Sequence, residues 1–129
     1  MRREQRLRRP ADFAAVHRRG RAVSCETLVL RSLTTSLPVA RVGFAVGKRV
    51  GGAVVRNRVK RRLRAAVAAT ALIPGRDIVV IARPPAAQRD YAALAAGLHS
   101  LLERARLLQP APERGQATPQ TGCEPRRSG

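Results

Sequence analysis

Residues 41–64 read RVGFAVGKRVGGAVVRNRVKRRLR, and this stretch decides the fold class that the sequence predicts. At its start, bulky and small residues alternate, which is typical of a β-strand with one crowded and one open face. Glycines then interrupt the pattern, and apolar residues return at helical spacing. The segment therefore predicts a strand, a glycine-rich loop and a helix that begins at Ala53 or Arg56 and ends near Ala71.

The predicted helix carries dense positive charge without compensation. Residues 41–64 contain nine Arg or Lys residues and no acidic residue, and no acid occurs between Glu26 and Asp77. The triplet Arg-Asn-Arg at 56–58 stands where the strand pattern gives way to the helical one. One side of the helix is apolar, and this stripe consists of Val59, Leu63, Ala66, Val67 and Thr70. Because the remaining basic sides need a polyanion to neutralise them, we expect RNA to be the partner.

Length and composition agree with a small nucleic-acid-binding protein. The 129 residues have room for one domain and a tail. The formal net charge is +18, and all but two of the 26 basic residues are arginines, whose planar guanidinium groups grip phosphate by two hydrogen bonds. No apolar run has the length of a membrane span, so we expect a cytoplasmic protein. Cys25 and Cys123 form neither a disulfide framework nor a metal cluster in this pattern.

The flanking segments predict two further helices and two further strands. Helices are expected over 10–19 and, after a cap at Asp90, through a leucine-rich stripe to about residue 105. Strands are expected over 27–33 and 77–82.

This order of elements predicts the α+β class, with a mixed sheet of about four strands and three helices in a single small domain. We expect a flexible basic N-terminus over 1–5, an RNA-binding domain over 6–106 and a disordered tail over 107–129. The tail is assigned by composition, because Pro, Gly, Gln, Thr and Arg replace almost all apolar residues there.

A pattern that begins in the same stretch resembles the signature of the bacterial ribonuclease P protein component. It consists of Arg41, Gly43, Val46, Lys48, Arg49, Gly51, Ala53, Val54, Arg56, Asn57, Arg58, Val59, Lys60, Arg61 and Arg64. The upstream LRRPADFAAVHRRG is similar to that family's first helix, and DIVVIARPPAA is similar to its last strand and the turn that follows. The resemblance covers about residues 6–105.

The resemblance implies a subunit of a ribonucleoprotein endonuclease. In that family an RNA subunit removes the 5′ leader from precursor tRNA with bound magnesium ions, so the protein is expected to supply no catalytic residue and to bind no cofactor alone. The implied partners are the catalytic RNA and the leader of precursor tRNA, with no membrane and no protein partner required. The resemblance also implies a left-handed crossover around the basic helix, against the usual right-handed rule.

The resemblance assigns residues to two sites. Contacts with the catalytic RNA are expected from Lys48, Arg49, Arg56, Asn57, Arg58, Lys60, Arg61 and Arg64. The leader is expected in a cleft between the sheet and the first helix, which includes Phe13, His17, Arg31 and Arg41. His17 and Arg31 stand where the family often has aromatic residues, and their flat side chains can still stack on bases. Asn57 is also open to a role in fixing the backbone near the helix start, and Phe13 to a role in the core.

Other kinds of protein also fit the residues taken alone. A structural RNA-binding protein of ribosomal type, without a role in cleavage, is the main alternative. A self-contained nuclease would need an acid–base pair, and His17 and His99 are the only histidines. A DNA-compacting protein would not distinguish precursor from mature tRNA.

Overall fold

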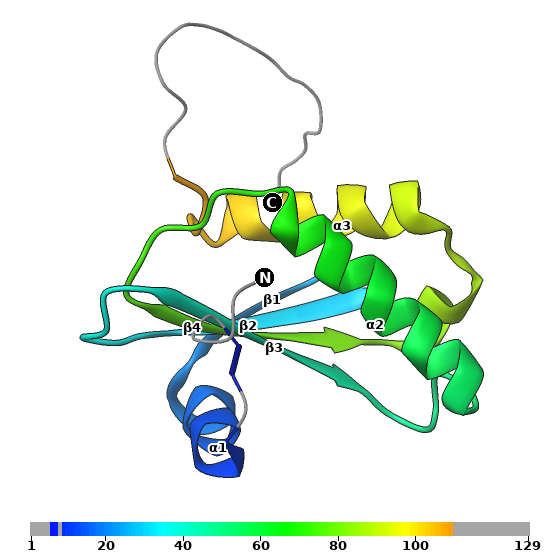
Figure 1. The fold of residues 1–129 in the computed structure, drawn as a ribbon, viewed down its shortest axis with the longest axis horizontal. Helices are drawn as coiled ribbons and strands as arrows, with labels where there is room; N and C mark the ends of the chain where they lie inside the picture. Colours follow the sequence, from blue (N-terminus) through cyan, green and yellow to red (C-terminus); the bar gives the residue numbers. More distant parts are fainter. Residues whose placement is uncertain (1–5, 8, 110–129) are drawn as a thin grey trace, which may run out of the picture.

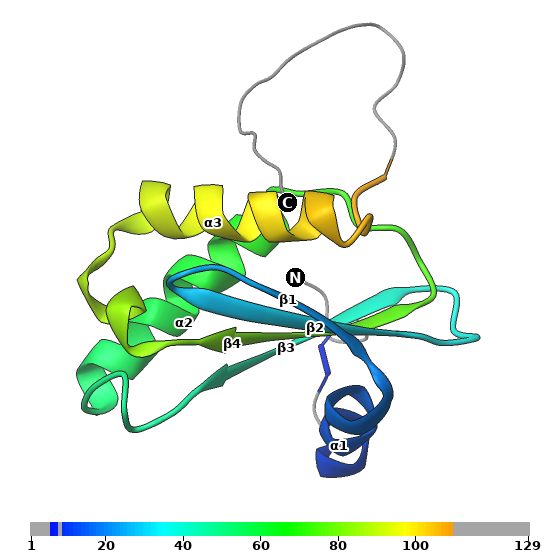
Figure 2. The same ribbon diagram turned by 180° about the vertical axis from the view of Figure 1, so that it is seen from behind.

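Four strands form one mixed sheet with helices on both faces, in a computed structural model that describes residues 6–7 and 9–109 (Figure 1). The elements in chain order are α1 (Pro10–Arg19), β1 (Arg21–Ser24), β2 (Leu28–Thr34), β3 (Ala40–Val46), α2 (Ala53–Ala68), β4 (Arg76–Ala82), the 3₁₀-helix η2 (Pro84–Gln88) and α3 (Tyr91–Arg104). Helices α2 and α3 cover one face of the sheet, and α1 lies against the other (Figures 1 and 2). The predicted α+β class with three α-helices is confirmed.

The strand order is β1-β2-β4-β3, and the chain reaches it by an unusual crossover. Strand β2 pairs antiparallel with both β1 and β4, whereas β3 and β4 are parallel. Strand β3 lies at the front in Figure 1, α2 passes above the sheet, and the chain returns in β4 behind β3. With both strands running in the same direction, this connection is left-handed, as expected from the resemblance.

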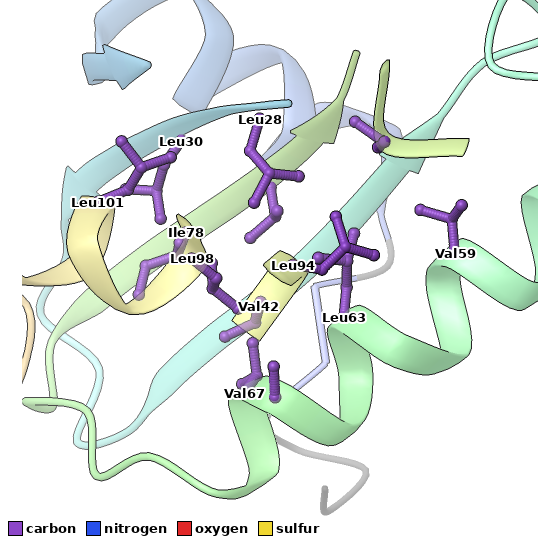
Figure 3. Packing of buried hydrophobic residues seen from close by; sticks show 14 of the residues in the cluster. Leu28, Leu30, Val42, Val59, Leu63, Val67, Ile78, Leu94, Leu98 and Leu101 are labelled. Carbon is purple, nitrogen blue, oxygen red and sulfur yellow. The ribbon is translucent and has the colours of Figure 1, made fainter. Parts of the chain in front are cut away.

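The main core lies between the sheet and the helices α2 and α3. Side chains alternate along each strand, so Leu28 and Leu30 of β2 and Ile78 of β4 all point to this layer (Figure 3). From the helices, Leu63 and Leu98 close the layer and are almost completely buried. The opposite face holds a smaller cluster, in which the buried residues are Leu7, Val16 and Val79.

The helices begin where their sequences predict. The side chain of Asp90 accepts a hydrogen bond of 2.9 Å from the backbone N–H of Ala93, which confirms the predicted cap of α3. Helix α2 buries Val59, Leu63, Ala66 and Val67, the apolar stripe read from the sequence. In the described part of the chain, no helix combines the length and the apolar character needed to cross a bilayer.

Three details differ from the sequence-based expectation. Strand β1 was not located by its residues, because RAVS is short and exposed and its pairing with β2 is not visible in local periodicity. Helix α2 ends at Ala68, so Thr70 lies beyond it, where its hydroxyl donates to the carbonyl of Val67 at 2.8 Å.

The third difference corrects the tail boundary. Leu107 is 1% exposed in the main core, and its carbonyl accepts from the N–H of Ile73 at 2.9 Å. Leu108 forms a bridge with Leu72, and the N–H of Gln109 donates to the carbonyl of Ala71 at 2.8 Å. The expectations for 1–5, for the remainder of the tail and for Cys123 fall outside the described residues.

Candidate nucleic-acid interface

Helix α2 directs its apolar stripe to the sheet and its basic side chains away from it. Asn57 and Arg61 are exposed. Half-buried positions along the flanks hold Arg56, Arg58, Lys60 and Arg64. Within residues 6–7 and 9–109, no carboxylate forms an ion pair with any of these basic groups. The outer surface of α2 is therefore positive from Arg56 to Arg64 and lacks a counter-charge among the described residues.

The start of α2 adds to this positive surface. Its capping residue is Gly52, which has no side-chain oxygen to accept from the first backbone N–H groups, and no acidic residue lies in the first turn. Lys48 and Arg49 are exposed in the turn just before it, where buried Val50 anchors the backbone. Free N–H groups and the positive end of the helix dipole favour an anion here, so this end of α2 is suited to phosphate.

Not every arginine of α2 is free for a ligand. Arg62 donates to the backbone carbonyl of Arg89 at 2.7 Å and so ties α2 to the segment before α3. Arg89 in turn pairs with Glu26 at 3.1 Å. Arg62 thus has a hydrogen-bond partner within the protein, whereas no side-chain hydrogen bond or ion pair within residues 6–7 and 9–109 holds the six residues assigned to RNA contact on this helix.

On the side of α2 next to β3, aromatic and basic groups meet. The guanidinium carbon of Arg64 lies 5.9 Å from the centre of the Phe44 ring. A small cavity of about 150 Å³ opens beside this pair, and Lys60, Arg6 and Phe13 contribute to its lining. The basic helix and the face that carries α1 are thus connected around the β3 edge of the sheet.

A separate groove lies between α1 and the sheet. Its volume is about 420 Å³, and its lining residues are Phe13, Ala14, His17, Arg18, Arg31, Ala45, Val79 and Ile81. The floor is formed by apolar side chains of β3 and β4, while His17, Arg18 and Arg31 supply polar groups at the side. Arg31 donates to the backbone carbonyl of His17 at 2.8 Å, which joins β2 to the end of α1. Flat apolar walls with guanidinium and imidazole groups are suited to unpaired bases.

Phe13 sits in this groove because Gly43 has no side chain. A Cβ atom built on Gly43 would lie 2.4 Å from the ring carbon Cζ of Phe13. The open face predicted for β3 thus receives an aromatic ring of this chain. Phe13 is half-buried, so one part of the ring packs on the sheet and the other faces the groove.

Substituting Gly43 with Ala is expected to displace the Phe13 ring and to destabilise the domain by about 1–3 kcal/mol through overpacking. The matched control is Ala45→Ser, a similarly small change on the same face of β3. Urea unfolding followed by circular dichroism measures both. Equal stability of G43A and the unsubstituted protein would contradict the close packing of Phe13 on β3.

Arg41, the fourth residue expected in the cleft, lies on the same face of the sheet but is not among the residues lining this groove. Its guanidinium donates two hydrogen bonds to the carboxylate of Asp77, at 2.9 and 2.7 Å. A third contact, 3.3 Å long, joins it to Asp12 of α1. The hydrogen bond with Asp77 raises the pKa of Arg41. Arg41 therefore connects β3, β4 and α1 beside the groove.

The two histidines and the carboxylates near the groove lie in separate surroundings. His17 lies on α1 and His99 on α3, on opposite faces of the sheet, so the two cannot share a site. Among residues 6–7 and 9–109 there is no cluster of three His, Cys, Asp or Glu side chains able to hold a metal ion. Asp12 and Asp77 come together only around the Arg41 guanidinium, and this arrangement does not fit magnesium.

The sequence predicted most of the polar residues of this groove but not the apolar residues that form its floor. Phe13, His17 and Arg31 do come together, as expected. Arg18, Val79 and Ile81 were not predicted to line the groove. The continuous apolar run DIVVIA predicts a strand that is buried on both faces, and strand geometry puts Val79 and Ile81 on the face of Asp77, but the position of α1 over that face is a tertiary property.

The family model and the relatives that match this sequence all carry the same description. A family model described as Ribonuclease P matches residues 1–106. The ribonuclease P protein component of Acidothermus cellulolyticus is 53% identical over 103 residues, covering 77% of this chain and 86% of the relative. That of Streptomyces bikiniensis is 50% identical over 112 residues, covering 78% and 91%.

Solved structures show the same fold. The RNase P protein of Staphylococcus aureus superposes with a TM-score of 0.75 at 29% identity, covering 81% of this chain and 98% of that one. For the RNase P protein of Thermotoga maritima the TM-score is 0.71 at 28% identity, covering 77% and 96%.

Proposed function

The chain belongs to the bacterial ribonuclease P protein family, and we propose that it serves the ribonucleoprotein through two surfaces, the basic face of α2 and the groove beside α1. Membership makes it a subunit of the endoribonuclease that processes precursor tRNA, associated with the ribonuclease P RNA. The assignment of a separate RNA ligand to each of the two surfaces is our proposal.

The face of α2 is proposed to contact the catalytic RNA. The observation that carries this assignment is the acid-free, outward-facing set of basic side chains on a helix whose other side is fully committed to the core. Arginine and lysine at such a surface bind mainly phosphate oxygens, which fix position and supply affinity without reading sequence. Lys48 and Arg49 extend the contact to the loop before α2.

The groove beside α1 is proposed to hold the 5′ leader of precursor tRNA. Its volume of about 420 Å³ is in the range of small-molecule pockets, which suits one or two unstacked bases rather than a duplex. The half-buried Phe13 ring offers a stacking surface, and Arg18 and Arg31 stand close enough to the groove to meet the sugar–phosphate chain. Arg41 is proposed to support this site through Asp12 rather than to touch the leader.

Protein side chains are proposed to take no part in bond cleavage. The chemistry, together with its magnesium ions, is assigned to the RNA; in support, the carboxylates of Asp12 and Asp77 are both already paired with Arg41. A cytoplasmic location follows from the partner, since tRNA precursors are processed there in bacteria.

Reconstitution tests the proposal. The protein is mixed with ribonuclease P RNA of the same organism, and removal of the 5′ leader is followed at a magnesium concentration where the RNA alone is nearly inactive. We expect cleavage to be restored, because cationic side chains replace magnesium in screening phosphate repulsion. A ribosomal-type protein would bind without restoring cleavage, and cleavage by the protein without RNA would indicate a self-contained nuclease.

Replacing Phe13 with Leu is expected to weaken binding of precursor tRNA by about 1–3 kcal/mol while leaving mature tRNA unaffected. Leucine keeps an apolar contact with Gly43 but removes the flat ring on which a base can stack. Affinities of the reconstituted complex for both tRNAs are measured at one salt concentration. As a control, Val16→Ile alters the buried side of the same helix. A uniform loss for both tRNAs would exclude the leader as the ligand of this groove.

A further inference from the structure

A second basic groove lies at the β1 edge of the sheet, between β1 and the end of α3. Its volume is about 480 Å³, and it is lined by Arg21, Ala22, Val23, Ser32, Arg104, Ala105 and Arg106. We propose that this groove is a second phosphate-binding site for RNA. The inference rests on the proposed function only in taking RNA as the partner.

Three arginines line this groove, and none of its lining residues is acidic. Arg21, Arg104 and Arg106 are all exposed, and Glu103, although adjacent in sequence, does not contribute to the lining. Arg104 donates to the carbonyl of Ser24 at 3.1 Å, which holds its guanidinium against the β1 edge. The planar fork of arginine matches phosphate geometry, so three of them around one groove favour a phosphate chain.

The backbone at Arg106 gives independent support. Its φ angle is +59°, in the left-handed region that residues with a Cβ atom rarely adopt. This conformation ends α3, because the N–H of Arg106 donates to the carbonyl of Glu103 and that of Leu107 to Leu102, both at 3.0 Å. Leu107 then enters the core with 1% exposure. Glycine or asparagine is favoured at such a helix end.

An arginine at this position costs stability that a glycine would avoid. Local strain of this kind is a reason to look for function, and here it coincides with a groove that two other arginines already line. Arg106 is exposed and lines the groove, so its side chain is accessible to a phosphate there.

The position of the groove determines which part of the RNA it can contact. Strands β1 and β3 are the two edges of the sheet, and α2 packs near β3 (Figures 1 and 2). The new groove lies at the β1 edge, so the protein has basic surfaces at both edges. Two such surfaces on one rigid domain bind two segments of the same RNA, and the second contact forms at high effective concentration.

Arg106→Gly tests the proposal because it separates stability from binding. We expect its midpoint of thermal unfolding to rise by a few degrees, since glycine relieves the left-handed backbone. Its affinity for ribonuclease P RNA at 0.15 M salt is expected to fall about four- to fivefold, and the slope of log K against log salt to become shallower by about 0.7–0.9. Filter binding over a series of salt concentrations measures both quantities.

Two control variants define the result. Arg106→Lys keeps both the charge and the backbone strain, so stability and salt slope should remain near those of the unsubstituted protein. Arg83→Gln removes one charge from an exposed residue that donates to the carbonyl of Cys25 at 3.2 Å and does not line the groove, so it should leave the slope unchanged. Arg21→Gln, on the exposed edge strand, should reproduce the loss of binding and provides a second test that does not depend on the end of α3.

Several outcomes would contradict the proposal that this groove binds phosphate. An unchanged salt slope in R106G and R21Q would exclude phosphate contact, and an equal loss in R83Q would show that only net charge matters. A lower unfolding midpoint for R106G would remove the argument from strain. If the unsubstituted protein did not bind the RNA, the proposed function itself would fail first, so the two failures are distinguishable.

Discussion

Replacing Arg41 with Met is expected to destabilise the domain by about 3–5 kcal/mol, because it leaves the carboxylate of Asp77 buried without a partner. Asp77 is 4% exposed, and its two oxygens accept hydrogen bonds of 2.9 and 2.7 Å from the Arg41 guanidinium. Methionine fills most of the same volume, so loss of packing contributes little. Urea unfolding at neutral pH measures the difference in free energy.

A double variant tests whether the loss of stability comes from the unpaired charge of Asp77 or from the substitution at position 41 itself. Arg41→Met combined with Asp77→Leu removes both charges together, and we expect it to recover most of the lost stability. The Asp12 contact, at 3.3 Å and more exposed, should add less than the pair with Asp77. If R41M alone unfolded with nearly the native free energy, the ion pair would not be what holds these strands and α1 together.

The pH dependence of this effect follows from the sign of the pKa shift. The hydrogen bond with Asp77 raises the pKa of Arg41 above its ordinary value. A group whose pKa is raised on folding contributes stability that is complete below its unfolded pKa and is lost only as pH rises through the folded pKa. Both values for arginine lie far above neutrality. We therefore expect the difference in stability between the protein and R41M to be the same at pH 7 and pH 9.

Neutralising the outer face of α2 is expected to lower affinity for ribonuclease P RNA by about 10²–10³-fold at 0.15 M salt. The variant replaces four residues with glutamine, and these are Arg56, Lys60, Arg61 and Arg64. Each lost phosphate contact should reduce the salt slope by about 0.7–0.9, so the slope should fall by roughly 2.8–3.6 in total. Glutamine has a helix propensity close to that of arginine and lysine, so α2 should still form.

The matched control is Arg62→Gln on the same helix. Arg62 donates to the carbonyl of Arg89 at 2.7 Å, so its loss should reduce stability and leave the salt slope almost unchanged. Circular dichroism verifies the fold of both variants before binding is measured. A quadruple variant that bound the RNA with the native salt slope would show that the face of α2 is not the phosphate-binding surface.

Much of the fold could be predicted because local periodicity coincides with tertiary burial. Val59 and Leu63 were read as the buried side of a helix, and both are fully buried. Asp90 was read as a cap, and it accepts the hydrogen bond that a cap requires. Strand β1 was missed because its four residues have no pattern of their own and are held by pairing with β2.

The amino-acid sequence alone was enough to predict the three α-helices, strands β2, β3 and β4, the basic character of α2 and the small residues on the α1 face of β3. These properties depend only on the types of residue in one segment and on their spacing. Both can be read from the charge and the apolar periodicity of that segment. Which arginines are available to bind a ligand depends on the tertiary structure. Arg41 and Arg62 are as basic as Arg61, yet the first two are bonded to partners 36 and 27 residues away in the chain. Long-range packing sets those contacts, and it also brings Arg21 beside Arg106 and places Phe13 on Gly43.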